Sequence, residues 1–224
     1  MEKNFRKAPE LVAGFKKLDT TCVADALDRF GFNGCLEGIK PINPGLTMCG
    51  QAYTVRYVPA GTVAGVGVGD FLEDVEPGEV VVIDNGGRMN MTVWGDLMAV
   101  SASAKGLAGT VIDGVCRDVP TIKRLNYPIF TKGYYMRTGK DRVELVAINQ
   151  PVEISNVLVE PGDIILADDT GAVVVPLGSA AEVLTAAQGI AEKEELILSE
   201  MAKGKTLKEA RAMVNYHHLQ SRQK

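Results

Sequence analysis

The sequence predicts an α/β fold, with short strands and helices mixed around a β core. Short β-branched runs such as residues 80–83 and 109–112 have the length and composition of strands. Between such runs lie stretches with helical apolar spacing, such as residues 97–104. The 224 residues are 46% hydrophobic and 23% charged, as in a soluble globular protein with a substantial core. A compact enzyme is compatible with this composition.

The first third of the chain is expected to form one helix and one strand. Thr20–Phe30 has an apolar helical face and is followed by Gly31, a typical helix stop. Residues 51–58 alternate enough to be a strand. The glycine-rich residues 61–70 do not follow a strand directly, as a dinucleotide-binding loop would require, because Pro59 and Ala60 intervene. We expect a flexible loop there, with a lid over a pocket as one role.

The segment from residue 84 to residue 118 contains the most informative pattern. The apolar run before it ends in Asp84-Asn85-Gly86-Gly87, a turn composition that predicts a strand end. A helix is expected from about residue 94 to Gly106, with its free N–H groups facing the glycine turn. A strand over 109–114 then leads to Arg117-Asp118 and to a second helix with Pro120 in its first turn.

This order predicts that two loops converge on one pocket. Twenty residues separate Asp96 from Arg117, enough for one helix and one returning strand. The pocket would then hold an acid, a permanent cation and a second acid, Asp118. The N–H groups of Leu97 and Met98, at a helix N-terminus, would add donors for an anion. Such a pocket suits a carboxylate substrate and a divalent cation.

The same residues also have a purely structural interpretation. Asp118 stands where an N-cap is expected, and Asp96 is favourable in a first helical turn through its charge alone. An arginine in a turn, such as Arg117, is usually just solvated. Spacing alone favours this structural interpretation.

A family resemblance favours the functional interpretation over the structural one. The run WGDLMAVSASAKGLAGTVIDGVCRDVPTIKRLNYPIFTKG resembles the core of the family containing the 4-hydroxy-4-methyl-2-oxoglutarate/4-carboxy-4-hydroxy-2-oxoadipate aldolases and the regulator of ribonuclease activity A. The resemblance extends from residue 21 to residue 175. Its aldolase members carry an Asp, twenty residues and then Arg-Asp, which Asp96, Arg117 and Asp118 match; the regulator-type members lack the first Asp. One departure is Thr121, where family members often have an acid.

The resemblance implies a βββα-like swivelling domain, a β sandwich flanked by helices, that assembles as a homotrimer or a hexamer. It also implies a divalent-metal-dependent (class II) aldolase, a lyase that cleaves 4-hydroxy-2-oxo dicarboxylic acids to pyruvate. Oxaloacetate decarboxylation would be a side activity, because the same pyruvate enolate forms. One alternative is a non-catalytic protein that regulates a ribonuclease. Another is a metal-dependent hydratase or lyase acting on a sugar acid.

The expected roles follow from the chemistry of a 2-oxo acid substrate. Asp118 is expected to hold Mg²⁺ or Mn²⁺, while Arg117 and the N–H groups of Leu97 and Met98 bind the substrate. Gly95, which has no side chain, would let the substrate carboxylate approach these N–H groups closely. Asp96 would orient or deprotonate a water molecule or the substrate hydroxyl.

The C-terminal part is expected to be a helical extension, from about residue 179, of a single domain spanning residues 1–224. Capping-box patterns at 179–182 and 206–209 predict helices that begin near residues 180 and 207, the first ending near 201. Four apolar residues on the first of these helices need a covering surface, as an oligomer would supply: Leu184, Ile190, Ile197 and Leu198. Three acids on the same helix are interpreted as a solvated face, or as a reach to a neighbouring subunit's metal site: Glu192, Glu194 and Glu195.

Several partner classes are disfavoured. The net charge of −4 shows no excess of positive charge that would favour binding to nucleic acid or to an anionic membrane. No window approaches a membrane span, and the four cysteines form no C-x-x-C pair. Without a signal-like N-terminus, we expect a cytoplasmic location. The adjacent His217 and His218 are weak evidence for zinc.

Overall fold

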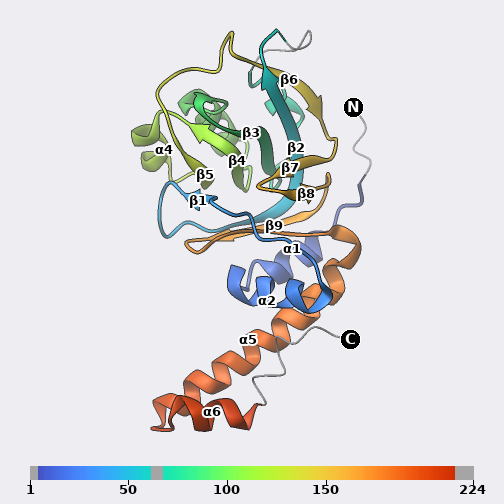
Figure 1. Ribbon diagram of the computed structural model, residues 1–224, viewed down its shortest axis with the longest axis vertical. Helices are drawn as coiled ribbons and strands as arrows, with labels where there is room; N and C mark the ends of the chain where they lie inside the picture. The colour runs from blue at the N-terminus through green and yellow to red at the C-terminus, as the bar shows by residue number, and fades with distance from the viewer. Residues whose placement is uncertain (1–4, 62–67, 215–224) are drawn as a thin grey trace.

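The computed structural model describes residues 5–61 and 68–214 (Figure 1). Its helices are α1 (Pro9–Phe15), α2 (Thr20–Phe30), α3 (Asp96–Ala104), α4 (Val119–Leu125), α5 (Ala180–Ala202) and α6 (Leu207–Met213), with short 3-10 turns at Leu72–Asp74 and Leu177–Ser179. The strands are β1 (Lys40–Pro41), β2 (Met48–Pro59), β3 (Val80–Thr92), β4 (Gly109–Cys116), β5 (Ile129–Tyr134), β6 (Val143–Ile148), β7 (Val152–Ile154), β8 (Val157–Val159), β9 (Ile164–Asp168) and β10 (Gly171–Val175). Most of the predicted glycine-rich loop (62–67) and both histidines lie outside the described residues.

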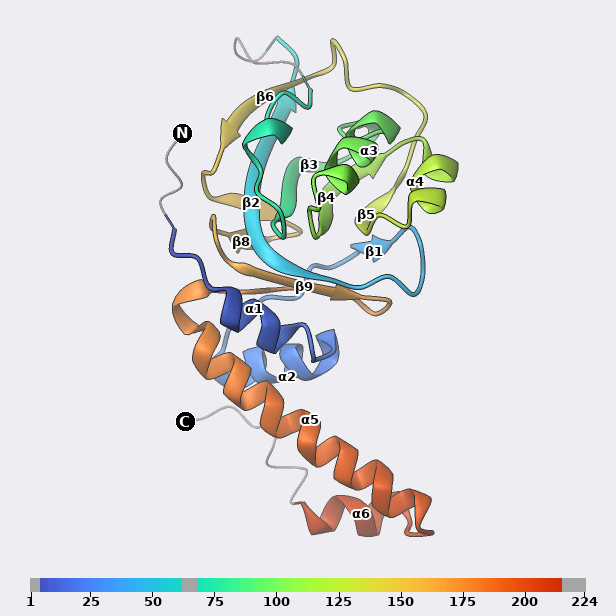
Figure 2. The same cartoon turned by 180° about the vertical axis from the view of Figure 1, so that it is seen from behind.

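The strands form a mixed sheet in the order β1-β5-β4-β3-β2-β9-β10, with β6 paired to β2 and a separate β7–β8 hairpin. Strands β2 to β5 are parallel to one another, and the outer strands pair antiparallel. Figures 1 and 2 show α3 and α4 on one face of the parallel strands, and α1, α2 and α5 beyond β9. The predicted α/β class, a β core flanked by helices, is confirmed.

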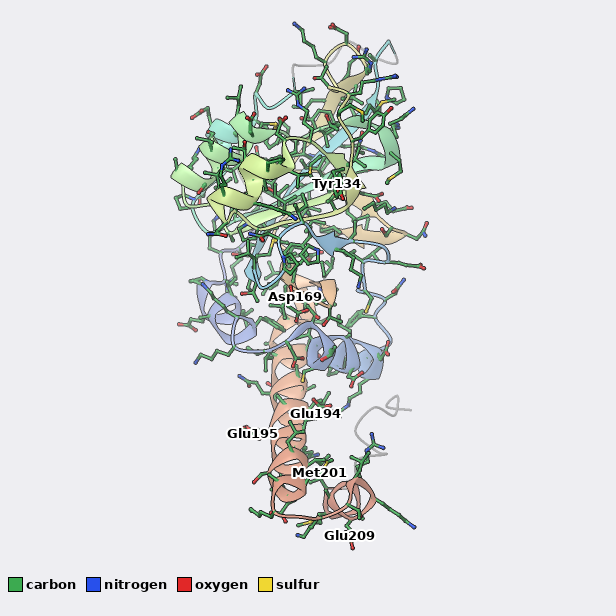
Figure 3. The ribbon with its side chains drawn as sticks, turned by 90° about the vertical axis from the view of Figure 1, so that its left-hand side faces the viewer. Tyr134, Asp169, Glu194, Glu195, Met201 and Glu209 are labelled. Carbon is green, nitrogen blue, oxygen red and sulfur yellow. The ribbon has the colours of Figure 1, made fainter. Side chains whose placement is uncertain are left out.

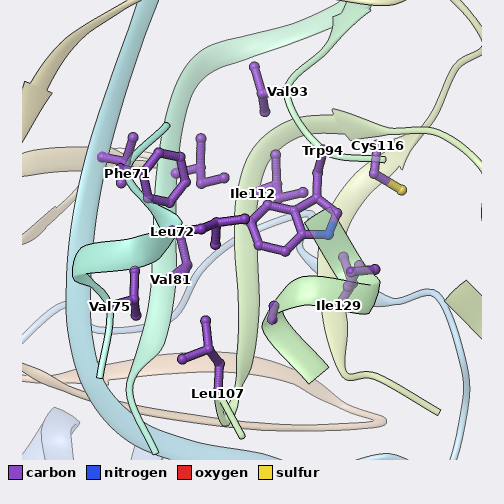
Figure 4. Packing of buried hydrophobic residues seen from close by; sticks show 14 of the residues in the cluster. Phe71, Leu72, Val75, Val81, Val93, Trp94, Leu107, Ile112, Cys116 and Ile129 are labelled. Atoms are coloured by element: carbon purple, nitrogen blue, oxygen red, sulfur yellow. The ribbon is translucent and has the colours of Figure 1, made fainter. Parts of the chain in front are cut away.

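The parallel strands are buried on both faces, which explains their nearly continuous apolar runs. One face, with Ile83 and Ile112, packs toward α3 and α4. Val82 and Val111, on the other face, pack toward the β7–β8 hairpin. In the first core Trp94 is 2% exposed and lies among Leu72, Ile112 and Ile129 (Figure 4). Its ring stacks on that of Tyr127 at 6.2 Å between centroids, which anchors the chain just before Gly95.

The predicted end of a strand at residues 84–87 is wrong. Strand β3 continues to Thr92, and the glycines interrupt its pairing instead. Gly86 and Gly87 have φ values of 57° and 67°, a conformation that glycine adopts without strain. Fully buried Asn85 and the neighbouring Arg88 hold the interruption, since the Arg88 guanidinium donates to the Asn85 backbone carbonyl at 2.6 Å. The composition that predicted a turn therefore forms a bulge.

Four charged residues lie side by side on the parallel strands β2 to β5, and we call them the charge row: Arg56, Asp84, Asp113 and Lys132. Arg56 pairs in register with Asp84, and Asp84 with Asp113. Arg56 Nε is 3.1 Å from Asp84 Oδ2, and Lys132 Nζ is 2.5 Å from Asp113 Oδ1. Both aspartates are buried, and burial raises the pKa of the Asp84 carboxyl despite the bonds it accepts.

Two similar segments, Glu76-Pro77-Gly78-Glu79 and Glu160-Pro161-Gly162-Asp163, form the same kind of turn. The Glu76 N–H donates to the Glu79 side chain at 2.8 Å, and the Glu160 N–H donates to the Asp163 side chain at 2.9 Å. The strands that follow, β3 and β9, pair with opposite edges of β2. The same unit, a turn followed by a strand, therefore occurs on both sides of β2.

The C-terminal helices begin where the sequence predicts. Thr206 and Glu209 form a capping box, whereas the Ser179 side chain caps nothing. The first half of α5 packs on α1 and α2, and its second half extends with α6 away from the sheet (Figures 1 and 2). The expectation that four apolar side chains need outside cover is wrong for Ile190 and Ile197, which the chain itself buries; Leu198 is 66% exposed.

Among the described residues, none of the helices combines the length and the apolar character that crossing a bilayer requires. The cytoplasmic location stays a prediction.

Candidate active site

A cavity of about 560 Å³ opens between the end of β3, the N-terminus of α3 and the loop before β6. Five residues that the sequence assigned to the site line it: Gly95, Asp96, Leu97, Met98 and Arg117. Asp118 lies directly beside them, against Gly95 and Arg117. A volume of this size is in the range of small-molecule sites.

Two hydrogen bonds in opposite directions join the converging loops. The Arg117 N–H donates to the Trp94 carbonyl at 3.0 Å, and the Asp96 N–H donates to Asp118 Oδ2 at 3.2 Å. The N-terminus of α3 therefore faces the loop at residues 117–118. The expectation that it faces the glycine turn is wrong, because Gly86 and Gly87 line a separate cavity at the charge row.

Gly95 is required by close approach and not by backbone conformation. Its φ of −140° is open to any residue, but a Cβ there would lie 2.8 Å from Asp118 Oδ2 and 3.2 Å from Arg117 Nε. The missing side chain lets the two functional residues of the second loop pack against the first. The groups that approach Gly95 closely are thus the chain's own.

Asp118 occupies the N-cap position of α4 but does not cap that helix with its side chain. It has φ 60°, a left-handed conformation that is uncommon outside glycine. Its carboxylate instead accepts the Asp96 N–H and lies 3.2 Å from Arg117 Nε. The interpretation of Asp118 as a cap of its own helix is therefore wrong, and the helix it caps is α3.

One of the N–H groups in the first turn of α3 is already hydrogen-bonded within the chain. Asp96 Oδ1 accepts the Leu97 N–H at 2.8 Å, while the Leu97 side chain is 83% exposed. An anion that binds both the Leu97 and the Met98 N–H groups must therefore displace Asp96 from that position. The Leu97 N–H is therefore not open to a ligand while Asp96 holds it.

The loop before β6 and the start of β6 contribute lining residues that sequence reasoning missed: Thr138, Lys140, Asp141 and Glu144. This loop is tied to the end of β3, because the Thr92 N–H and hydroxyl donate to the Arg137 carbonyl at 3.2 and 3.0 Å. Its sequence resembles ordinary polar surface, so no local signal identifies it. The pairing of residues 92 and 138 that places it is long-range.

The carboxylates of Asp118 and Asp96 are the candidates for binding a metal ion. In residues 5–61 and 68–214, no three or more His, Cys, Asp or Glu side chains group as metal ligands. Mg²⁺ commonly binds through one or two carboxylates and keeps several waters. Asp118 beside the cavity fits such a site, completed by water and substrate, and does not fit a cage made only of protein ligands.

Comparison with known proteins identifies the family. A family model described as RraA-like, Aldolase/RraA, matches residues 20–174, which include the whole 96–118 segment. The chain belongs to the RraA-like family. Membership confirms the resemblance seen in the sequence.

Curated relatives of this RraA-like chain include an aldolase candidate. Protein DlpA of Legionella pneumophila is 39% identical over 206 residues, which cover 91% of this chain; the match spans about a third of DlpA (33%). A Halalkalibacterium halodurans protein, provisionally named a 4-hydroxy-4-methyl-2-oxoglutarate aldolase, is 34% identical over 80% of this chain and 82% of its own length.

Solved structures agree with the fold. An uncharacterized protein from Pseudomonas syringae pv. tomato matches 92% of this chain and 99% of its own, with 39% identity and a TM-score of 0.85. RraAS2 of Streptomyces coelicolor, described as an unusual member of the RNase ES inhibitor RraA protein family, matches 90% of this chain and 99% of its own. Its TM-score is 0.77 at 28% identity.

Proposed function

We propose that this protein is a class II, divalent-metal-dependent aldolase that cleaves 4-hydroxy-2-oxo dicarboxylic acids and releases pyruvate. Oxaloacetate decarboxylation is its proposed side activity. The observation that carries the proposal is that the loop of Asp96 and the loop of Arg117 and Asp118 are hydrogen-bonded to each other at the edge of one cavity. The provisional name of the H. halodurans relative supports the same reaction.

Arg117 is suited to bind the 2-oxo acid end of the substrate. Its Nε faces Asp118, and its terminal nitrogens form no hydrogen bond or ion pair with another residue in the described chain segments. A guanidinium offers planar, paired donors and keeps its charge at all working pH values. The positive end of α3 adds to the attraction for a carboxylate. These groups bind the substrate at the end that becomes pyruvate.

Cleavage requires one proton to leave and one to arrive. Asp96, directly or through a water molecule, accepts the proton of the C4 hydroxyl as the C3–C4 bond breaks and a carbonyl forms at C4. The bonding pair passes into the three-carbon fragment as an enolate, whose oxygen Arg117 stabilises. A proton delivered to C3 then gives pyruvate.

A divalent cation fits this scheme through Asp118. Mg²⁺ or Mn²⁺, when bound, polarises the 2-oxo and carboxylate oxygens as a Lewis acid. Asp118 holds this ion in the proposal, and its contact with Arg117 keeps the cation site and the guanidinium side by side.

The test is release of pyruvate from 4-hydroxy-4-methyl-2-oxoglutarate and from oxaloacetate, coupled to lactate dehydrogenase. We expect activity with added Mg²⁺ or Mn²⁺ and its loss with a chelator. If neither acid yields pyruvate in the presence of metal, the aldolase proposal fails.

A second candidate function is regulation of a ribonuclease by binding, which the match to RraAS2 over 90% of the chain favours. Asp96 favours the enzyme, since the regulator-type members lack that acid. Tight binding of a ribonuclease without pyruvate release would select the regulator. A hydratase or lyase acting on a sugar acid would use the same pocket, and mass spectrometry of such acids after incubation with protein and metal separates it, because it detects the gain or loss of water as well as cleavage.

We also propose that the protein assembles as a homotrimer or a hexamer. Apolar side chains remain exposed on the outer part of α5 and on α6: Leu196, Leu198, Met201, Leu207 and Met213. Figure 3 shows Glu194 and Glu195 on the extended part of α5, far from Tyr134 on the sheet. Within one chain Glu194 accepts a bond from Cys22 and lies outside the cavity. In an assembly, an acid of α5, Glu192, Glu194 or Glu195, reaches a neighbour's site.

A further inference from the structure

Lys140 lines the same cavity as Arg117 and lies in the loop before β6. The other ionisable side chains of this part of the lining, Asp141 and Glu144, are acids. Among the described residues no carboxylate forms an ion pair with Lys140, whereas Arg117 is paired with Asp118. This part of the lining therefore offers an anionic group one cation, Lys140, and two acids that repel it.

The turn that carries Lys140 is held in place by backbone contacts. A Cβ on Gly139 would lie 2.2 Å from the Thr92 carbonyl oxygen, so only glycine allows this approach. The Arg142 guanidinium donates to the carbonyls of Thr138 and Lys140 at 3.3 and 3.2 Å. Since Thr92 lies three residues before Gly95 on the same strand end, the lysine and the substrate-binding segment share one support.

The chemistry of the substrate gives this cation a use. A 4-hydroxy-2-oxo dicarboxylate has one carboxylate beside the 2-oxo group and a second beyond C4. With the first at Arg117, the second must lie against another part of the cavity lining, to which residues 138–144 contribute. There Asp141 and Glu144 repel it unless a cation intervenes. A monocarboxylate has no charge to place there.

We propose that Lys140 binds the distal carboxylate and thereby selects dicarboxylic over monocarboxylic 4-hydroxy-2-oxo acids, an inference that rests on the proposed function. The lysine acts on substrate choice and takes no part in breaking the C3–C4 bond. Discrimination is a difference between two substrates, so one variant measured on both reveals it.

The experiment compares wild-type protein with Lys140→Met and with Lys123→Met. Lys123 is an exposed lysine on α4 that does not line the cavity, so its substitution controls for the loss of one positive charge. The substrates are 4-hydroxy-4-methyl-2-oxoglutarate and the monocarboxylate 4-hydroxy-2-oxopentanoate, both of which release pyruvate. We expect Lys140→Met to lower kcat/KM for the dicarboxylate by about tenfold or more and to leave the monocarboxylate unchanged. Lys123→Met should change neither.

Calorimetric binding of 2-oxoglutarate and pyruvate, with Mg²⁺ present, separates this inference from the reaction. If the wild-type protein cleaves both acids and Lys140→Met keeps the same preference, the assignment of Lys140 is overturned while the aldolase stands. If no acid is cleaved, yet 2-oxoglutarate binds more tightly than pyruvate and Lys140→Met abolishes that preference, Lys140 keeps its role and the reaction fails. Equal or absent binding of the two acids by an inactive wild-type protein overturns both.

Discussion

Asp118 Oδ2 accepts the backbone N–H of Asp96 at 3.2 Å. A carboxylate from one loop therefore caps the helix that begins on the other loop. The proposed metal ligand and the proposed proton acceptor are coupled through this bond, so changes at either position must be followed in fold and activity together.

Asp118→Asn is predicted to separate the structural role of Asp118 from its chemical role. The amide oxygen can still accept the Asp96 N–H, and asparagine tolerates the left-handed backbone at this position. We expect a melting temperature within about 4 °C of wild type and loss of metal-dependent pyruvate release. Asp169→Asn, at an exposed aspartate that accepts the Gly45 N–H, serves as the control. Activity retained in Asp118→Asn would contradict the metal assignment.

Arg117→Lys keeps the charge and removes the planar, paired donors. Loss of one well-placed transition-state donor typically lowers kcat by about 100-fold or more, and we expect that size of loss in pyruvate release. Arg124→Lys on α4, whose guanidinium donates only locally to Thr121 at 3.0 Å, should leave kcat unchanged. If Arg117→Lys is as active as wild type, the planar, paired donors of the guanidinium are not used in the reaction.

Asp96→Asn is predicted to affect two reactions unequally. The amide oxygen can keep the bond to the Leu97 N–H but cannot take up a proton. Aldol cleavage needs a hydroxyl proton removed, and oxaloacetate decarboxylation does not. We therefore expect a larger loss of kcat for 4-hydroxy-4-methyl-2-oxoglutarate than for oxaloacetate, measured on one preparation. Equal losses would assign Asp96 a structural role alone.

Gly95→Ala should disturb the site without disturbing the fold. The new methyl group would stand 2.8 Å from Asp118 Oδ2 and must push the Arg117–Asp118 loop away. We expect normal circular dichroism and a loss of pyruvate release. Gly178→Ala is the matched control, because nothing lies within 4 Å of its added Cβ. Full activity in Gly95→Ala would mean that the close approach is dispensable.

Sedimentation velocity should give the mass of three or six chains of 24.0 kDa each. Leu198→Lys, which charges an exposed apolar position on α5, should shift the equilibrium toward smaller species. A wild-type monomer at micromolar concentration would refute the assembly and, with it, the shared acid of α5.

Local patterns were sufficient to predict helices α2 to α6, strands β2 and β4, the start of β3, and the convergence of the loops that carry Asp96 and Arg117. A helix followed by a returning parallel strand must bring its two flanking loops to the same edge of a sheet, so spacing alone carries that prediction. The glycines at 86 and 87 were misread because a turn and a bulge need the same backbone angles. Only the resumed pairing of β3 with β4 distinguishes them.

Two features of the site depend on contacts that no local pattern encodes. The side chain of Asp118 was expected to cap α4, and its acceptor role toward α3 arises from the packing of Gly95 against it. Lys140 enters the cavity because Thr92 bonds to Arg137, 45 residues further along the chain. Such pairings belong to the tertiary structure.

The charge row has a consequence for how the sheet assembles. Its two ion pairs, Arg56 with Asp84 and Lys132 with Asp113, form when β2 to β5 are aligned as observed. A slip of β3 by one residue would turn Asp84 into the apolar core around Trp94, away from its cation, and an uncompensated buried carboxylate costs several kcal/mol. Valine-rich strands have little else to tell one alignment from the next. The four charges thus favour the observed alignment of the strands over a slipped one.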